Sequence, residues 1–136
     1  MEFYIWMAGS LPFILLGSIH LIYTFSTNKF STRNSQLEAE MKVSSPILTS
    51  QTTMWKAWIG FNGSHSLGAI YFGIINFCLA AIHATILRHP IFILINLMTV
   101  AFYLWLAIRY WFSIPLKGII IAFVLMLVAS VMFLVN

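Results

Sequence analysis

The chain has 136 residues, of which 61% are hydrophobic and only 7% are charged, and its formal net charge is +4. A water-soluble domain has about a quarter of its residues charged, and a small one leaves much of its surface in water. The composition therefore excludes an ordinary soluble domain and predicts one transmembrane domain over residues 1–136. The seven basic residues are too scattered to follow a phosphate backbone, so we expect no nucleic-acid partner.

Four apolar runs follow one another along the chain, at about residues 3–25, 55–83, 90–110 and 115–135. A helix needs about 20 residues to cross the hydrocarbon core of a bilayer, and backbone groups in lipid must be bonded within their own segment. The pattern predicts an all-α integral membrane protein, a four-helix bundle with antiparallel up-down-up-down topology. The fourth run is almost purely aliphatic, and we expect it to face lipid or a partner.

The longest connection, residues 26–54, is polar. Its stretch 33–42 is either a short interfacial helix, with Leu37 and Met41 on one face, or a solvated loop. Basic residues gather on one side of the predicted spans, where we count Lys29, Arg33, Lys42, Lys56, Arg109 and Lys117, against Arg88 alone on the other. The positive-inside rule then predicts a multi-pass protein of the cell membrane, with this connection cytoplasmic and both termini outside. Tyr4 and Trp6 are expected at the outer surface.

The predicted second span has two faces that are suited to packing. At about 100° per residue, one stripe contains Asn62, His65, Ser66, Ala69, Gly73 and Asn76. On nearly the opposite stripe lie Gly60, Ser64 and Gly68, and such small residues let a neighbouring helix approach closely. We therefore expect protein contacts on both faces, with Gly73 and Gly17 of the first span as further packing positions.

Polar residues of the first three spans form a candidate ligand-binding set, which we call the polar seam: His20, Asn62, His65, Ser66, Asn96 and Tyr103. Consecutive spans run in opposite directions, so His20 and His65 are predicted at similar depth. Polar groups at membrane depth are costly unless paired, and the seam should face the bundle interior.

Two interpretations of the polar seam compete. The first is structural, with interhelical hydrogen bonds that hold the bundle together. The second is a ligand site. Two facing histidines at one depth are what the axial ligation of haem b requires, which makes His20 and His65 candidate ligands of a haem iron, and a lipid or quinone is a further option.

The sequence lacks residues that several kinds of catalysis and cross-linking require. Cys78 is the only cysteine, and we expect it to be buried. Because it has no second cysteine to pair with and aspartate is absent, the chain has no intrachain disulfide and no Ser-His-Asp triad. We expect no catalytic residue and favour a non-enzymatic accessory or interaction subunit, whose partners are the lipid bilayer and other membrane subunits or a second copy. The alternatives are a membrane haem b electron-transfer protein and a small-molecule or lipid-binding transporter or enzyme.

One motif combines Gly17-x-x-His20, Thr53-x-Trp55 and Gly60-Phe-Asn-Gly-Ser-His-Ser-x-Gly68. On these residues the chain resembles a group of small bacterial four-helix membrane proteins whose activity is uncharacterised. The resemblance covers about the first half of the chain, and the last two spans match only in being apolar. It implies the four-helix fold and marks His20, Asn62 and His65, but it implies no reaction.

Overall fold

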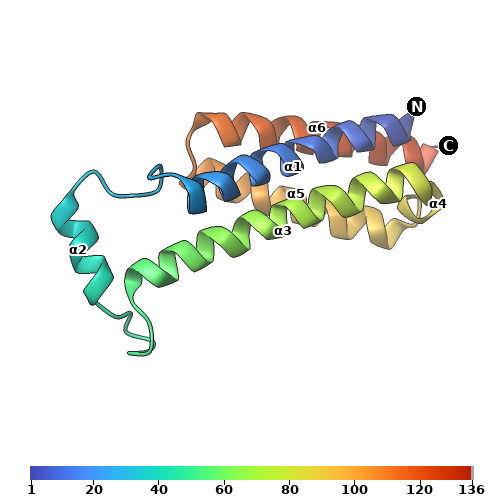
Figure 1. Cartoon of the computed structure of the whole chain (residues 1–136). Coiled ribbons are helices and arrows are strands. Elements are labelled where there is room, and N and C mark those ends of the chain that lie inside the picture. Colours follow the sequence, from blue (N-terminus) through green and yellow to red (C-terminus); the bar gives the residue numbers. More distant parts are fainter. Residues whose placement is uncertain (136) are drawn as a thin grey trace. The chain divides into compact units, whose positions relative to one another are not determined.

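The computed structural model describes residues 1–135, apart from the side chain of Ala84, and throughout this range the chain forms helices and their connections, with no strand (Figure 1). The helices are α1 (Glu2–Ser26), α2 (Ser35–Val43), α3 (Met54–Ile82), α4 (Ala84–Leu87), α5 (Pro90–Tyr110) and α6 (Ser113–Val135). The all-α prediction is thus confirmed for the part of the chain that the structure describes.

Four of these helices, α1, α3, α5 and α6, are long and apolar enough to cross a membrane. The shortest of them, α5, has 21 residues, and at about 1.5 Å per residue this length spans the hydrocarbon core. It begins at Pro90, since proline has no N–H that the first turn would leave unbonded. The Nδ1 atom of His89 accepts a hydrogen bond from the Ile91 N–H at 3.3 Å and caps the helix.

The chain divides into two compact units, with the boundary inside both α1 and α3. The first, which we call the bundle unit, contains Met1–Leu16 and the chain from Ala69 onward. The second, which we call the connection unit, contains Gly17–Gly68. Each is described by itself below.

The core of the bundle unit includes one stripe of α6. Its buried residues are Ile119, Ala122, Met126, Ala129, Ser130 and Phe133. Besides the exposed aliphatic face that was expected to meet lipid or a partner, α6 thus has a buried face that was not predicted. Small side chains such as Ala122 let α1 approach closely, and a Cβ on Gly9 would lie 3.4 Å from the Ala122 carbonyl oxygen.

Aromatic and charged contacts join the start of α1 to the ends of α6 and α4 within the bundle unit. The rings of Phe3 and Phe133 have centroids 5.2 Å apart. The Glu2 carboxylate pairs with the Arg88 guanidinium at 3.0 Å and with the amino group of Met1 at 3.1 Å. The thiol of Cys78, which lies on α3, was expected to be buried. It is exposed, so that expectation is wrong.

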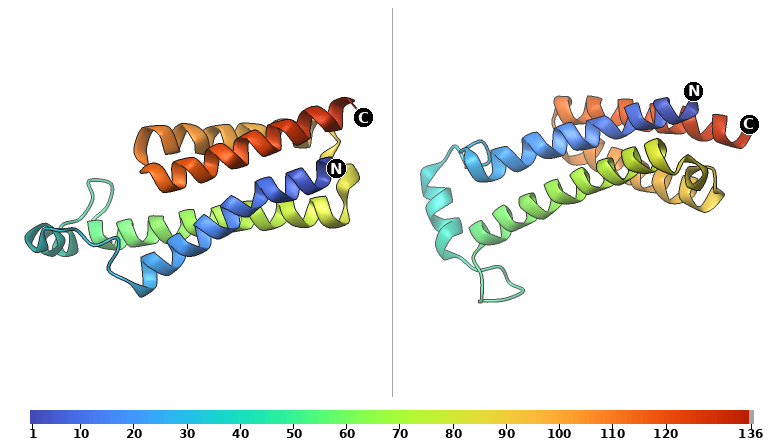
Figure 2. Two further views of the ribbon diagram at one scale, coloured as in Figure 1. Left: turned by 90° about the horizontal axis from the view of Figure 1, so that it is seen from above. Right: turned by 45° about the vertical axis from the view of Figure 1, so that its right-hand side comes forward.

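In the connection unit, α2 lies crosswise to the segments of α1 and α3 that it links (Figures 1 and 2). Asn34 caps α2 by accepting hydrogen bonds from the N–H groups of Gln36 and Leu37. The Lys42 ammonium donates to the Glu38 carboxylate at 2.6 Å, and this hydrogen bond holds the pKa of Glu38 below its usual value. Of the two alternatives for residues 33–42, the structure thus contains the helix.

Candidate functional site

The centre of the polar seam is a hydrogen bond between α1 and α3 in the connection unit. The Nε2 atom of His20 lies 3.0 Å from the Oδ1 atom of Asn62. The Asn62 amide nitrogen donates to the Trp58 carbonyl oxygen at 2.8 Å, so both ends of this carboxamide are used. Because Oδ1 can only accept, His20 donates from Nε2 and carries its proton there.

Aromatic rings surround the imidazole of His20. Phe30, from the connection after α1, packs against it with ring centroids 4.5 Å apart. His65 also packs against it, with centroids 5.6 Å apart and ring planes inclined by 70°. The indole N–H of Trp58 donates to the Phe30 carbonyl oxygen at 3.2 Å and holds this segment in place. The ring of Phe61 stacks on His65, with an interplanar angle of 7°.

The hydroxyl groups near this pair bond to their own helices. Ser66, which is buried, donates to the Asn62 carbonyl oxygen at 2.7 Å. Thr24 donates to the His20 carbonyl oxygen at 2.8 Å. Such bonds to the preceding turn satisfy a hydroxyl without a partner from another helix. Ser66 therefore uses its hydroxyl hydrogen within α3.

The other two residues of the polar seam belong to the bundle unit. Asn96 is buried and donates to the Phe92 carbonyl oxygen at 2.8 Å. The ring of Tyr103 packs edge-on against Phe13, with centroids 5.2 Å apart. The structure thus brings His20, Asn62, His65 and Ser66 together in one unit, and Asn96 and Tyr103 lie in the other.

Sequence reasoning missed a second interhelical bond, between Trp6 and Asn76. The Trp6 indole N–H donates to the Asn76 Oδ1 atom at 3.0 Å, and the Asn76 amide donates to the Phe72 carbonyl oxygen at 3.0 Å. Trp6 is 0% exposed and Asn76 is 1% exposed. Trp6 was expected at the outer membrane surface, where an amphipathic indole is common. It is buried because Asn76 gives its N–H a partner inside the protein.

The packing positions on α3 divide into two groups. Gly73 is buried against α1, and a Cβ there would lie 2.9 Å from the Ser10 carbonyl oxygen. Gly60, Ser64 and Gly68, which we call the small-residue ridge, are exposed, and a Cβ on either glycine of the ridge would meet no atom within 4 Å. The predicted protein contact on this face is thus not made within the described chain. Gly17, on α1, is buried.

The two histidines do not fit axial ligation of a haem as they are arranged. A haem iron needs one ring nitrogen from each histidine aimed at it, with the flat macrocycle between the two rings. The Nε2 atom of His20 is instead directed at Asn62, and the rings of Phe30 and His65 lie against the same imidazole. Among the described residues, His, Cys, Asp and Glu form no group of three that could hold a metal ion.

Comparisons with known proteins find no matching family model, no matching curated protein and no matching solved structure. The resemblance drawn from the motif over residues 17–20 and 53–68 therefore stays a prediction.

A double-mutant cycle tests the bond between His20 and Asn62. We expect His20→Phe and Asn62→Leu to be coupled by about 0.6 to 2 kcal/mol, the range measured for interhelical hydrogen bonds in membranes. The coupling is measured from unfolding free energies in a fixed detergent or lipid mixture. Ser64→Ala is the control, because the Ser64 hydroxyl bonds to its own helix. Strictly additive effects of the two substitutions would contradict a direct bond.

Proposed function

We propose that this chain is a non-enzymatic accessory subunit of the cell membrane, which binds other transmembrane helices. In this proposal α1, α3, α5 and α6 cross the bilayer as an antiparallel up-down-up-down bundle. The asymmetry of basic residues favours a cytoplasmic connection between α1 and α3. The contact of Phe3 with Phe133 supports an arrangement with both termini on one side, which is then the outside.

The proposal is carried by the way in which the polar seam is bonded. Asn62 uses both ends of its carboxamide within the chain, and Ser66 and Asn96 bond to their own helices. Across the described residues, every buried side-chain nitrogen or oxygen has a hydrogen-bond partner. A ligand site would need polar groups that are directed at the ligand instead. These bonds support the structural interpretation of the polar seam over the ligand-binding one.

The small-residue ridge is the face on which we place the partner helix. Helices in lipid gain little from the hydrophobic effect, and they associate through close packing of small residues. The ridge offers this surface, since no side chain of the described chain covers Gly60 or Gly68. A second copy of the chain and another membrane subunit both present helices of the kind that would pack there.

Substitution of both ridge glycines tests the proposal. Gly60→Leu with Gly68→Leu should weaken association with the partner by about tenfold or more, because overpacking a tight contact costs about 1–3 kcal/mol. Partners are quantified by mass spectrometry after extraction of native membrane patches with a polymer. Self-association is measured by disulfide formation of Ser64→Cys in a Cys78→Ser background.

The control is Ala101→Leu, which enlarges an exposed small residue on α5. It should leave association unchanged, and neither variant should be less stable than the parent chain, because the ridge has room for larger side chains. The proposal is wrong if the native chain is extracted alone and as a monomer. It is equally wrong if the double substitution leaves every association unchanged.

We also propose that the chain is related to the small bacterial four-helix membrane proteins that it resembles. It rests on Gly17 and His20 of α1 and on the motif between Thr53 and Gly68. His20 and Asn62, two of the three residues that it marks, form the interhelical bond described above. A structural role for the motif agrees with this bond.

A further inference from the structure

The short helix α2 has no core of its own. None of its nine residues is buried. Isolated helices shorter than about 12 residues are marginal in water, and the Asn34 cap with one Glu38–Lys42 pair adds only a little. A helix of this kind is typically stabilised by a surface on which its apolar side chains can lie.

The loop after α2 presents apolar side chains at its tip. Leu48 is 92% exposed and Ile47 is fully exposed. The loop is nevertheless ordered by two backbone bonds, from the Thr49 N–H to Pro46 and from the Met54 N–H to Ser44. A closed turn that holds two aliphatic side chains away from the chain is suited to insertion into an apolar medium.

The direction of α2 agrees with a position along a membrane surface. Within the connection unit, α2 lies crosswise to the ends of α1 and α3 (Figure 1 and the right-hand view of Figure 2). If α1 and α3 cross the bilayer, as proposed above, α2 runs along its surface. Its Leu37 and Met41 are four residues apart and share one face.

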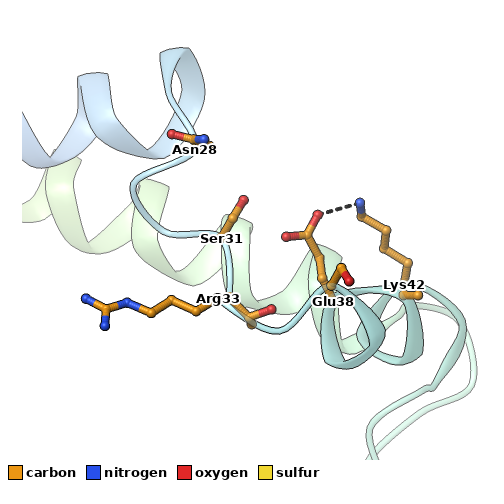
Figure 3. A pocket seen from close by; sticks show the side chains of 8 residues that line it. Asn28, Ser31, Arg33, Glu38 and Lys42 are labelled. Atoms are coloured by element: carbon orange, nitrogen blue, oxygen red, sulfur yellow. Dashed lines mark hydrogen bonds and ion pairs between the residues drawn. The ribbon is translucent and has the colours of Figure 1, made fainter.

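Charge favours an anionic lipid surface. Residues 27–56 contain four basic and two acidic side chains. Lys42 is paired with Glu38, and no ion pair among the described residues involves Lys29, Arg33 or Lys56. An open pocket of about 570 Å³ lies beside α2, and its lining includes the Glu38 carboxylate as well as Asn28 and Ser31 (Figure 3). Arg33 extends away from the Glu38–Lys42 pair and leaves its guanidinium open to a phosphate (Figure 3).

We propose that α2 and the loop over residues 44–53 form an interfacial foot, which binds anionic phospholipids of the membrane that α1 and α3 cross. Ile47 and Leu48 insert at the boundary between headgroups and acyl chains. Lys29 and Arg33 contact headgroup phosphates. The inference rests on the proposed membrane insertion of α1 and α3.

Depth measurements on the full chain test the insertion. A nitroxide label is placed at Leu48→Cys, or for comparison at Ser50→Cys, in a Cys78→Ser background, and the protein is reconstituted in vesicles of phosphatidylcholine with phosphatidylglycerol. We expect the label at position 48 to be more accessible to oxygen than to a water-soluble nickel chelate, and the label at position 50 to show the reverse. Equal access to the nickel chelate at both positions would overturn the insertion.

Lipid selectivity tests the charge contribution. Spin-labelled phosphatidylglycerol should associate with the parent chain more strongly than spin-labelled phosphatidylcholine, with a preference that falls as salt is added. Removing one charge, by Lys29→Gln or Arg33→Gln, should lower this preference about fivefold. Arg88→Gln, which removes a basic residue that lies on the predicted opposite side and is paired with Glu2, is the matched control and should leave this preference unchanged. Unchanged selectivity in both the Lys29→Gln and the Arg33→Gln variant would overturn the proposed headgroup contacts.

A flotation assay separates this inference from the proposal on which it rests. A chain that fails to float with vesicles after an alkaline wash is not inserted, and the proposed membrane function fails with it. A chain that floats while the label at position 48 stays in water contradicts only the interfacial foot.

Discussion

Replacing Trp6 with alanine is expected to lower the free energy of unfolding by about 3 kcal/mol, the largest loss that we expect from one substitution. Trp6 is completely buried, and its ring packs on Phe133 with centroids 5.6 Å apart. Truncation of a buried tryptophan costs about 3–5 kcal/mol in proteins. We expect the lower end, because in lipid the loss comes mainly from packing and from the bond to Asn76. Unfolding is measured by steric trapping or by denaturant in mixed micelles.

Two controls separate packing from hydrogen bonding at this position. Trp6→Phe keeps a ring but removes the N–H, so the buried Asn76 Oδ1 atom loses its partner and a smaller loss of about 1 kcal/mol should result. Tyr4→Ala truncates an exposed aromatic residue on the same helix and should have little effect. Equal stability of Trp6→Ala and Tyr4→Ala would show that Trp6 is not part of the core.

The four long helices could be predicted from sequence because the thickness of hydrocarbon fixes the length that an apolar helix needs. The bounds of α5, Pro90–Tyr110, agree with the predicted run at about 90–110. The burial of one α6 stripe was missed, because an aliphatic helix in lipid shows no polar side to separate its faces. Ala122 and Ala129, which are seven residues apart and both buried, were the available signal.

The polar seam could be predicted only in part. The similar depth of His20 and His65 followed from antiparallel spans, and their rings do lie in contact. The bond from His20 to Asn62 also sets a register. In an antiparallel pair, a contact of residue 20 with residue 62 predicts a contact fourteen positions away, between residues 6 and 76, because fourteen residues are close to four turns. The Trp6–Asn76 bond fits this rule and could have been found from it.

Other features of the polar seam had no signal in the sequence. A serine such as Ser66 bonds either to its own helix or across to a neighbour, and both choices place it on the same stripe. The position of Phe30 on the His20 ring depends on how the connection after α1 folds back, for which helical periodicity gives no rule. Side-chain direction and loop path therefore had to come from the structure.

Gly73→Ala is expected to lower the free energy of unfolding by about 1–3 kcal/mol, the usual cost of overpacking a tight contact. A Cβ on Gly73 would lie 2.9 Å from the Ser10 carbonyl oxygen and 3.0 Å from the Ile14 backbone nitrogen. These are backbone atoms of α1, so no side-chain rotation can relieve the clash, and the two helices must separate.

Gly68→Ala is the matched control in the same helix, because a Cβ there meets nothing within 4 Å. Alanine has a higher helix propensity than glycine, so Gly68→Ala should raise the free energy of unfolding by up to about 1 kcal/mol. The opposite signs of the two effects, measured under the same unfolding conditions, distinguish a glycine that is required for close packing from one that is not. If Gly73→Ala were as stable as Gly68→Ala, then α1 and α3 would not approach each other at Gly73, and the close packing that is described for the bundle unit would be wrong at that point.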